Sequence, residues 1–324
     1  MFDVVTFGGA TRDIVVRTTA GKLITTDHNL RATKLLGFEY GAKIPVLRTY
    51  DNFGGGACNV AVGLAQLGLR VACRINLGRD LDGLRIKKNL KAAKVSGELI
   101  SWDKKERTDL SVVIIDENGG GDHIVFVDKN ASNNLNLGHK KFTSQWIYIS
   151  SLTGEWLTLL KELAQFAAKK KIKIVFNPGL AQLSAGYEGL HEILHNVEIL
   201  VLTLDEAIEL VLSKNKNFSL LAGNIARELF SWGPKIVVVT EGAKGASTYD
   251  GKELHFQEAV KISEVVDTTG AGDAFSAAFL GAIALGKDIK TALLWGVKNG
   301  ANVIKDYGAQ TGLLMRKEIE KKEA

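Results

Sequence analysis

The chain has 324 residues, of which 46% are hydrophobic and 24% are charged, and its formal net charge at pH 7 is +5. This length and balance predict a globular protein with a large buried core, and they exclude a disordered chain. The longest apolar stretch, residues 274–286, is too short to span a bilayer, and the basic residues are scattered, so we expect neither a membrane nor a nucleic acid as a partner.

Short β-branched runs alternate with helical patterns along the chain. In chain order we predict strands at residues 3–9, 70–78, 144–150, 173–179, 197–203 and 235–242, and helices at 59–68, 84–93, 154–171, 204–212 and from 274 onward. The strands are apolar on both faces, which indicates a buried parallel sheet. This alternation predicts an α/β fold in which a doubly wound, mostly parallel sheet is sandwiched by helices.

Two segments interrupt the alternation, residues 14–53 and 108–128. The first carries strand-like runs without a long helix. The second has two alternating runs joined by a glycine-rich turn, which is a strong hairpin signal. Such alternation indicates that one face of these strands is solvated or covers something mobile. We therefore predict a single domain, residues 1–324, whose two insertions form a small β-sheet lid beside the main sheet.

The two cysteines, Cys58 and Cys73, are too few for a disulfide framework, and neither has metal-ligand spacing. We expect reduced, buried thiols, which are typical of a cytosolic protein. Residues 1–13 contain an acidic residue and only a short apolar run, so they are unlike a signal peptide. These features predict a cytoplasmic location.

The residues DTTGAGDAF at 267–275 place small side chains immediately before a predicted helix. Gly270, Ala271 and Gly272 would lie at its N-terminus, where the first backbone amides have no internal partner and the helix dipole adds positive charge. Small residues let a phosphate approach these amides. Asp273 lies in the same turn, and a carboxylate base beside an anion site suits the attack of a hydroxyl on a phosphoryl group. The alternative is a plain glycine turn with Asp273 as a helix cap.

This motif resembles the C-terminal signature of the ribokinase-like sugar kinases, also called the PfkB carbohydrate kinase family. GGGACNVAVGLAQLG at 54–68 is similar to the glycine-rich N-terminal motif of that family. Further similar stretches are NLGRDLDG at 76–83, FNPG at 176–179, TEGAKGA at 240–246 and YGAQTG at 307–312. Their order and spacing fit almost the whole chain. The resemblance implies a ribokinase-like fold and an ATP-dependent phosphotransferase that acts on an alcohol.

The resemblance also implies roles for individual residues. Asp273 would be the catalytic base, and the amides of residues 270–273 would hold the transferring phosphate. Asp13 would bind substrate hydroxyls, and Gly54, Gly55 and Asn59 match a second substrate-contacting element. Carboxylates, amides and accessible glycine backbone suit the recognition of a polyol. Without the resemblance, Asp13 is a solvated turn residue and Asn59 is a helix N-cap.

Cation and nucleotide contacts follow from the same resemblance. Glu206 matches the acid of an Asn-x-x-Glu motif that helps to hold Mg²⁺ through water, although Thr203 replaces the asparagine. The alternative for Glu206 is a carboxylate stabilised by a helix N-terminus. Asp267 resembles a residue that supports a monovalent cation in many members, which leaves K⁺ as an option here. The loop expected to face ATP, at the carboxyl end of a strand, contains Thr240, Gly242 and Gly245.

Other function classes fit less well. The turn after the first strand reads GGATRD and lacks the G-x-G-x-x-G of a nicotinamide dehydrogenase, and the chain contains no G-x-x-x-x-G-K-[ST] P-loop. A non-catalytic regulator that binds sugar or nucleotide on this fold stays an alternative. The presence of Asp273 argues against it.

The family spans sugars, sugar phosphates and nucleosides, and we expect a free sugar as the acceptor. A nucleobase would need aromatic stacking, and the aromatic candidates in the lid region are Phe38, Tyr40 and Phe53. A sugar phosphate would need extra basic residues, and the candidates are Arg17, Lys43, Arg48 and Arg107. The resemblance further implies a homodimer that pairs through an exposed lid strand.

Overall fold

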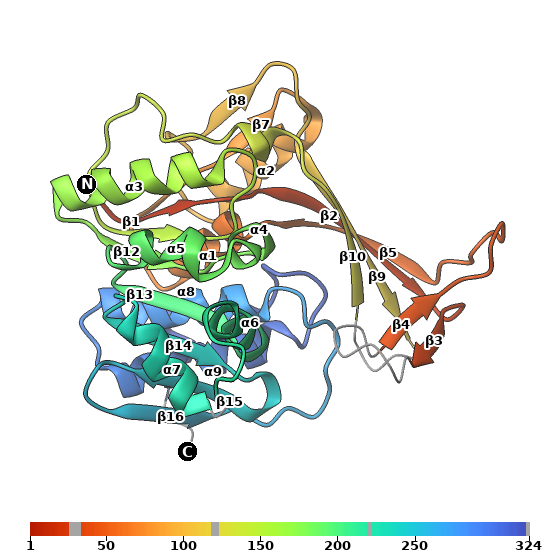
Figure 1. The fold of residues 1–324 in the computed structure, drawn as a ribbon. Coiled ribbons are helices and arrows are strands. Elements are labelled where there is room, and N and C mark those ends of the chain that lie inside the picture. Colours follow the sequence, from red (N-terminus) through yellow and green to blue (C-terminus); the bar gives the residue numbers. More distant parts are fainter. Residues whose placement is uncertain (26–33, 118–122, 220–221, 322–324) are drawn as a thin grey trace.

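The computed structural model describes residues 1–25, 34–117, 123–219 and 222–321. An eight-stranded sheet with helices on both faces forms the body of the molecule, and a separate four-stranded sheet projects from one side of it (Figure 1). This arrangement confirms the predicted α/β class, with a mostly parallel main sheet and a small second sheet.

The main sheet has the strand order β16-β15-β14-β13-β12-β11-β1-β6. In that order the strands span Leu254–Glu258, Gly245–Tyr249, Ile236–Thr240, Ile199–Thr203, Lys173–Phe176, Ser144–Ile149, Phe2–Phe7 and Val71–Arg74. The six strands from β14 to β6 are parallel, whereas β15 and β16 are antiparallel. In β1, Val4 belongs to the core on one face, and Val5 and Phe7 belong to the core on the other. Burial on both faces explains the continuous apolar runs in the sequence.

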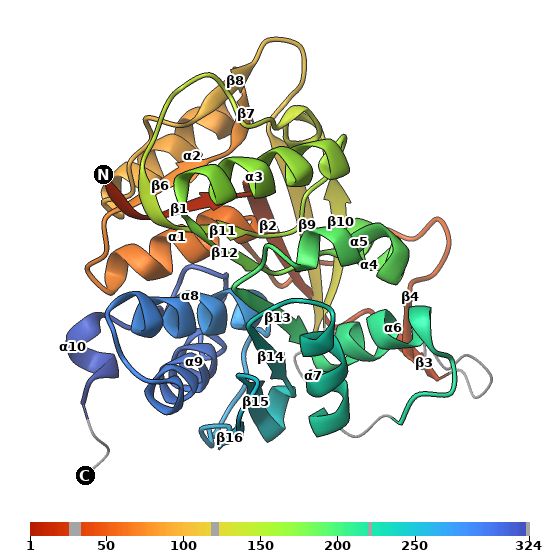
Figure 2. The same ribbon diagram turned by 60° about the vertical axis from the view of Figure 1, so that its left-hand side comes forward.

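Helices cover both faces of the main sheet (Figure 2). The core on the Val4 face contains residues of α1 (Gly56–Gln66), α2 (Leu81–Ala92), α8 (Ala271–Ala284), α9 (Ile289–Val303) and α10 (Arg316–Ile319). The core on the opposite face contains residues of α3 (Trp156–Lys170), α4 (Leu180–Ser184), α5 (Gly186–Leu194), α6 (Leu204–Lys214) and α7 (Ala222–Ser231). Among the residues described, no helix is long and apolar enough to cross a membrane.

Small residues let α8 lie close to α1 and α9 (Figure 2). A Cβ added to Gly63 of α1 would lie 2.6 Å from Ala277 Cβ, and a Cβ added to Gly296 of α9 would lie 2.6 Å from the ring of Phe275. Larger residues at these positions would push α8 away, because the core is already close-packed. This packing fixes the N-terminus of α8, which carries the DTTGAGDAF motif.

The second sheet has the strand order β10-β9-β2-β5. Its strands span His123–Asp128, Asp109–Asp116, Thr11–Thr18 and Arg48–Gly54. The β9–β10 pair is antiparallel, as expected of a hairpin in residues 108–128, although residues 118–122 lie outside the described part of the chain. β3 (Lys22–Thr25) and β4 (Lys34–Gly37) form a two-stranded sheet within the predicted 14–53 insertion, of which residues 26–33 are likewise not described. That these strands act as a lid stays a prediction.

Some elements escape the sequence analysis. The predicted strand at 70–78 divides in two, because β7 (Asn76–Gly78) leaves the main sheet and pairs with β8 (Ser101–Asp103). The antiparallel strands β15 and β16 and the helices α5, α7 and α9 are not predicted. In α9, Gly296 and Gly300 weaken the local helix signal, and packing against α8 overrides that weakness. The short helices η1 (Ala131–Asn134) and η2 (Gly242–Lys244) lie in loops.

Candidate active site

The N-terminus of α8 has the open geometry that an anion site requires. Gly270 is the N-cap, with φ of 80°, and a Cβ there would lie 2.3 Å from Ala309 Cβ, so only glycine fits this turn. Ala271 and Gly272 begin the helix, and a Cβ added to Gly272 would meet no atom within 4 Å. The first-turn amides have no acceptor within the helix. Apart from Ala271, whose backbone N–H donates to the carbonyl oxygen of Thr268 at 3.3 Å, the turn therefore presents its backbone donors and the positive end of the helix dipole to an approaching anion.

Asp273 is the third residue of α8, so the interpretation of this residue as a helix cap is wrong. Its half-buried carboxylate accepts a hydrogen bond from Asn59 Nδ2 to Oδ2 at 2.8 Å. Oδ1 faces Gly56, where an added Cβ would lie 3.3 Å away. Burial raises the pKa of Asp273, the Asn59 hydrogen bond lowers it, and the charge of Asp13 raises it further. A raised pKa makes this carboxylate a stronger base than an exposed aspartate.

Asn59 lies in the first turns of α1 and is 5% exposed. The N-cap of α1 is Gly55, so the alternative that Asn59 is the N-cap is wrong. Gly55 has φ of 89°, and a Cβ there would lie 2.4 Å from the carbonyl oxygen of Gly9. This close approach of two backbones sets the direction in which α1 leaves the second sheet, and it turns the amide of Asn59 toward α8.

Asp13 lies in β2, and at 6% exposure it is not the solvated turn residue that its sequence context suggests. Thr11 Oγ1 donates to Asp13 Oδ1 at 2.6 Å, and Ser111 Oγ donates to the same oxygen. A Cβ added to Gly54 would lie 1.9 Å from Oδ2, so the glycine makes room for the carboxylate. Burial raises the pKa of Asp13, and the two hydroxyls oppose that rise.

Lys129 lies close to the candidate site, and the sequence analysis did not identify it. A Cβ added to Gly9, in the turn after β1, would lie 3.4 Å from Lys129 Nζ. The ammonium group lies 3.5 Å from Asp109 Oδ2, and the charge of Lys129 lowers the pKa of Asp13. Asp109 is itself fixed by the amides of Asn130 and Ser132. The result is one cation held beside the predicted sugar-binding carboxylate, and no local motif marks it in the sequence.

The predicted nucleotide and magnesium residues lie at the carboxyl ends of neighbouring strands. Thr203, the last residue of β13, pairs in register with Thr240, the last residue of β14. Gly242 follows in the exposed turn η2, and Gly245 begins β15. Their position at this edge of a parallel sheet is where ligands of doubly wound folds bind.

Glu206 belongs to a capping box at the start of α6. Its Oε2 accepts the backbone N–H of Thr203 at 2.8 Å, while Thr203 Oγ1 accepts the backbone N–H of Glu206 at 3.3 Å. The local structure of Glu206 is therefore the alternative given above, a carboxylate stabilised by the N-terminus of a helix. Burial raises the pKa of Glu206. The threonine in place of the usual asparagine serves as the helix N-cap.

Asp267 is fully buried, before the turn into α8. Its Oδ1 accepts the backbone N–H of Thr269 at 2.9 Å, and its Oδ2 accepts that of Gly308 at 3.1 Å. The hydroxyl of Thr269 is buried without a hydrogen-bond partner among the described residues. An unsatisfied hydroxyl oxygen beside a buried carboxylate is the donor chemistry that a hard cation takes.

The carboxylates share one electrostatic environment. The charges of Asp267 and Asp13 each act on a neighbouring carboxylate, because Asp267 raises the pKa of Asp13 and Asp13 raises that of Asp273. Burial raises the pKa of the Tyr148 hydroxyl in β11, and the charges of Asp273 and Glu206 raise it further. Such a concentration of negative charge fits a site that works with cations.

The aromatic and basic candidates are mostly engaged elsewhere. Phe53 packs against the main core, and Tyr40 is fully exposed. Tyr50 of β5 stacks on Tyr307 at a centroid distance of 4.4 Å, and Arg17 lies 4.9 Å from the Tyr307 ring. Among the basic candidates, Arg17 pairs with Glu117, and Arg48 lies over the ring of Tyr50. Lys43 and Arg107 are exposed.

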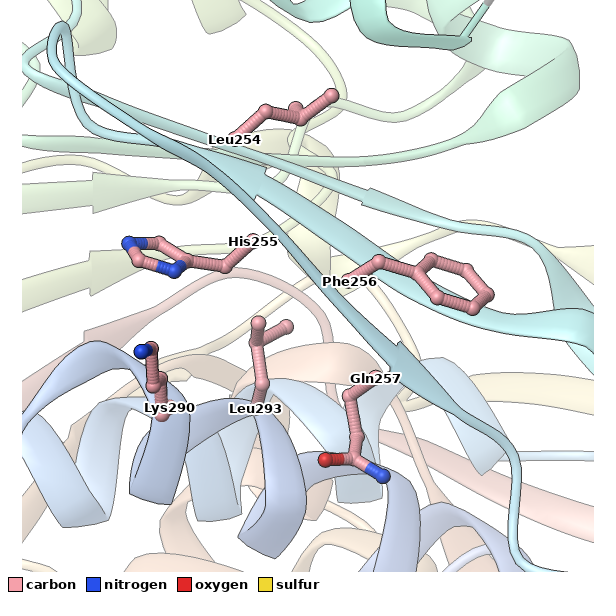
Figure 3. Close-up of a pocket in the computed structure, with 6 residues that line it drawn as sticks. All are labelled: Leu254, His255, Phe256, Gln257, Lys290 and Leu293. Carbon is pink, nitrogen blue, oxygen red and sulfur yellow. The ribbon is translucent and has the colours of Figure 1, made fainter.

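A separate pocket of about 300 Å³ lies between β16 and α9 (Figure 3). Its lining consists of Leu254, His255, Phe256, Gln257, Lys290 and Leu293. None of these is a predicted site residue, and the pocket holds no carboxylate that could serve as a base.

A comparison with known proteins bears on what this arrangement does. The family model described as pfkB family carbohydrate kinase matches residues 21–315. The chain belongs to this family. A cytidine kinase from Thermococcus kodakarensis is 27% identical over 259 residues, which are 79% of this chain and 88% of that protein. A ribokinase from Bacillus subtilis is 27% identical over 273 residues, which are 82% of this chain and 86% of that protein.

The solved structures agree on the fold of this pfkB family member. A ribokinase from Cryptococcus neoformans var. grubii in complex with ADP has a TM-score of 0.77 at 22% identity, covering 99% of this chain and 99% of that chain. The ribokinase-like fold and the family expected from the sequence are thereby confirmed. Membership makes the chain an ATP-dependent phosphotransferase of the carbohydrate kinase class.

Proposed function

We propose that the protein transfers the γ-phosphoryl group of ATP to a hydroxymethyl or other alcohol group of a small sugar, with Asp273 as the base. The observation that carries this proposal is the position of Asp273 in the first turn of α8. One of its oxygens is held by Asn59, and the small residues Gly270 and Gly272 keep the adjoining amides accessible. A base and an anion site in one helical turn are suited to in-line phosphoryl transfer.

Each group then has a role in the transfer. Asp13, with Gly54, Gly55 and Asn59, holds the hydroxyls of the acceptor. Asp273 Oδ1 accepts the proton of the attacking hydroxyl and aims its oxygen at the phosphorus. The amides of residues 270–273 stabilise the charge that develops on the transferring group. Burial raises the pKa of Asp273, which supports this role, because a base works best when its pKa approaches the working pH.

The cofactors are ATP with Mg²⁺, and a monovalent cation such as K⁺ beside Asp267. Glu206 would hold Mg²⁺ through water, and Thr240, Gly242 and Gly245 would face the nucleotide. When bound, Mg²⁺ neutralises part of the phosphate charge that the carboxylates of the site would otherwise repel. Support comes from the oxygen-only donor set and from the unpartnered hydroxyl of Thr269 beside Asp267.

A free sugar is the acceptor that the side chains favour. Of the three aromatic candidates, Phe53 packs against the core and Tyr40 is fully exposed, so neither lines an enclosed site for a base, and Phe38 is half-buried. Arg17 and Arg48 are engaged by Glu117 and Tyr50, which argues against a sugar phosphate. A nucleoside is the second candidate, because one relative is a cytidine kinase. The same family also includes the ribokinase relative.

The second sheet would act as a lid that excludes water from the site, since water competes with the acceptor for the phosphoryl group. Its outer strand β10 also exposes apolar side chains, with Val125, Phe126 and Val127 at 39%, 60% and 50% exposure. An unpaired apolar edge strand favours pairing with another strand. We therefore include a homodimer through the lid, which Phe126→Asp should convert to a monomer in sedimentation analysis. A mass that is the same for both variants would count against it.

The test is ATP consumption by the purified protein against pentoses, hexoses, ketoses, sugar acids, sugar phosphates and nucleosides. Asp273→Asn should lower kcat by about 10²-fold or more while ATP still binds. Asp128→Asn, which changes an exposed carboxylate on β10, is the matched control and should keep full activity. Retained turnover in Asp273→Asn would reject the proposed base, and turnover of nucleosides alone would reject the proposed acceptor.

A further inference from the structure

Four side chains from distant parts of the sequence form an unbroken hydrogen-bonded chain that ends on Asp273. Asn89 Nδ2 donates to Gln310 Oε1 at 2.7 Å, and Gln310 Nε2 donates to Asn59 Oδ1 at 3.0 Å. Asn59 Nδ2 then donates to Asp273 Oδ2 at 2.8 Å. Asn89 lies on α2 and Gln310 lies in the segment after α9, so neither belongs to the turn that carries the base.

The direction of every bond in this chain is dictated by the carboxylate. An ionised Asp273 can only accept, so Asn59 must present its NH₂ group to it and its carbonyl oxygen to Gln310. Gln310 must then present NH₂ to Asn59 and its own carbonyl oxygen to the NH₂ group of Asn89. If any amide turned over, two donors or two acceptors would meet. This direction is the one that an ionised Asp273, the state that a base needs, requires of the chain.

Resting on the proposed function, we propose that Gln310 and Asn89 are positioning residues for phosphoryl transfer. They hold the amide of Asn59 so that its N–H stays on Asp273 Oδ2, which leaves Oδ1 to receive the acceptor hydroxyl. Asn59 is nearly fully buried, whereas Asn89 and Gln310 are half-buried, so the two outer residues lie where substitutions need not disturb the core.

Other groups also act on Asp273, and the test must separate them from the amide chain. The groups in its electrostatic environment are Asp13 on β2, Cys58 on α1 and Tyr148 on β11. Asp13 opposes ionisation of Asp273. The hydrogen bond with Cys73 and burial raise the pKa of Cys58, and burial raises that of Tyr148, so both groups are held in their neutral form. Asn89 and Gln310 carry no charge, and the hydrogen bonds that connect them to Asp273 run through Asn59.

The variants follow from the directionality. Asn89→Ala and Gln310→Met each remove a link, which should lower kcat about 3- to 10-fold and move the acid limb of the kcat–pH profile to higher pH, with little change in KM. Asn89→Asp puts an acceptor-only group at the outer end. Gln310 should then turn its NH₂ toward residue 89, Asn59 should turn in response, and its carbonyl oxygen should face Asp273, which favours the protonated base.

Asn89→Asp should therefore shift the acid limb further than Asn89→Ala. Its new charge also acts directly through space, and the double variant Asn89→Asp with Gln310→Met isolates that effect because the relay is cut. The excess shift of Asn89→Asp should vanish in the Gln310→Met background. An excess that persists there would be a field effect and would overturn the proposal. Asn217→Asp, the same change on an exposed loop after α6, is the charge control and should leave the profile unmoved.

A readout independent of turnover keeps this inference separate from the proposed function. Aspartate labelled with ¹³C at Cγ can be titrated by NMR, and the Asp273 signal is the one that Asp273→Asn removes. Its midpoint should rise in Asn89→Ala and rise further in Asn89→Asp. If the wild type phosphorylates no alcohol, the proposed function fails while this titration still decides the positioning role. If it is active but the midpoint is equal in all variants, the positioning role fails alone.

Discussion

Replacing Gly54 with alanine tests directly whether Asp13 holds the acceptor. The new Cβ would lie 1.9 Å from Asp13 Oδ2 and 2.8 Å from Thr11 Oγ1. Ordinary van der Waals contact begins near 3.4 Å, so the carboxylate must retreat by about 1.5 Å. Thr11 and Ser111 hold the other oxygen, so the retreat also disturbs those two bonds.

The cost of this displacement can be worked from the bonds involved. A hydrogen bond to a charged group contributes about 1.5–3 kcal/mol. Losing one such bond between Asp13 and an acceptor hydroxyl lowers kcat/KM by roughly 10- to 150-fold. We expect this loss to appear mainly as a higher KM, because Asp13 would bind an acceptor hydroxyl equally before and during the transfer.

The assay is initial-rate kinetics with the best acceptor of the panel, together with thermal denaturation to show that the fold is kept. Gly37→Ala, on β4, is the matched control. Its Cβ would come closest to the movable Cδ1 end of Ile24, at 3.0 Å, and its next contact, with the carbonyl oxygen of Lys22 at 3.7 Å, is an ordinary van der Waals distance. Gly37→Ala should keep its KM. If Gly54→Ala retained the KM of the wild type, the reasoning that places the acceptor on Asp13 would be refuted.

Three more predictions follow from charge and packing. Asp273→Asn should raise Tm at pH 8. Burial raises the pKa of Asp273 in the folded state, so above that pKa the ionised carboxylate destabilises the fold and its removal is a gain. The gain in Tm should shrink as the pH falls through the raised pKa, and a Tm difference that does not depend on pH would contradict this prediction. Lys129→Met should raise the acceptor KM about 2- to 5-fold, because Asp13 loses the cation that lowers its pKa. With a higher pKa, more Asp13 is protonated at low pH, so the rise in KM should be larger at pH 6 than at pH 8. Initial rates at both pH values check this. Tyr307→Ala removes the stack on Tyr50, which would hold the second sheet in place beside the acceptor. The variant should raise the acceptor KM about 2- to 12-fold and change kcat less. An unchanged KM would show that the stack does not hold the second sheet in place.

The sequence predicts the strands of the main sheet well where burial on both faces leaves a continuous apolar run. The predicted strand at 235–242 corresponds to β14, Ile236–Thr240, and the predicted strand at 144–150 corresponds to β11, Ser144–Ile149. It fails where a tertiary contact replaces a local signal. Gly296 and Gly300 weaken the local helix signal of α9, yet the helix forms because these glycines let α8 pack closely against it.

The site divides in the same way. Asp273 and its glycines stand in one short motif, so local reasoning identifies them. The hydrogen bond between Asn59 and Asp273 joins residues 214 apart, and that between Gln310 and Asn59 joins residues 251 apart. No local pattern signals a polar contact over such a separation. Lys129 and Asn89 were missed for the same reason, since each gains its role only when the fold brings it to the site.

The segment between α9 and α10 explains how these distant parts are held in one geometry. Four consecutive residues each contact a different part of the site: Tyr307 stacks on Tyr50, the amide of Gly308 donates to Asp267, Ala309 packs on Gly270, and Gln310 donates to Asn59. These four residues therefore connect the second sheet, the buried carboxylate of Asp267, the turn at Gly270 and the amide of Asn59 that holds Asp273. Because backbone geometry fixes the spacing of four adjacent residues, a shift of the second sheet must strain the contacts to the base or break the Tyr50–Tyr307 stack. The position of the second sheet and the alignment of Asp273 are therefore linked through this segment, in addition to the direct connection from β5 through Gly55 into α1 and Asn59.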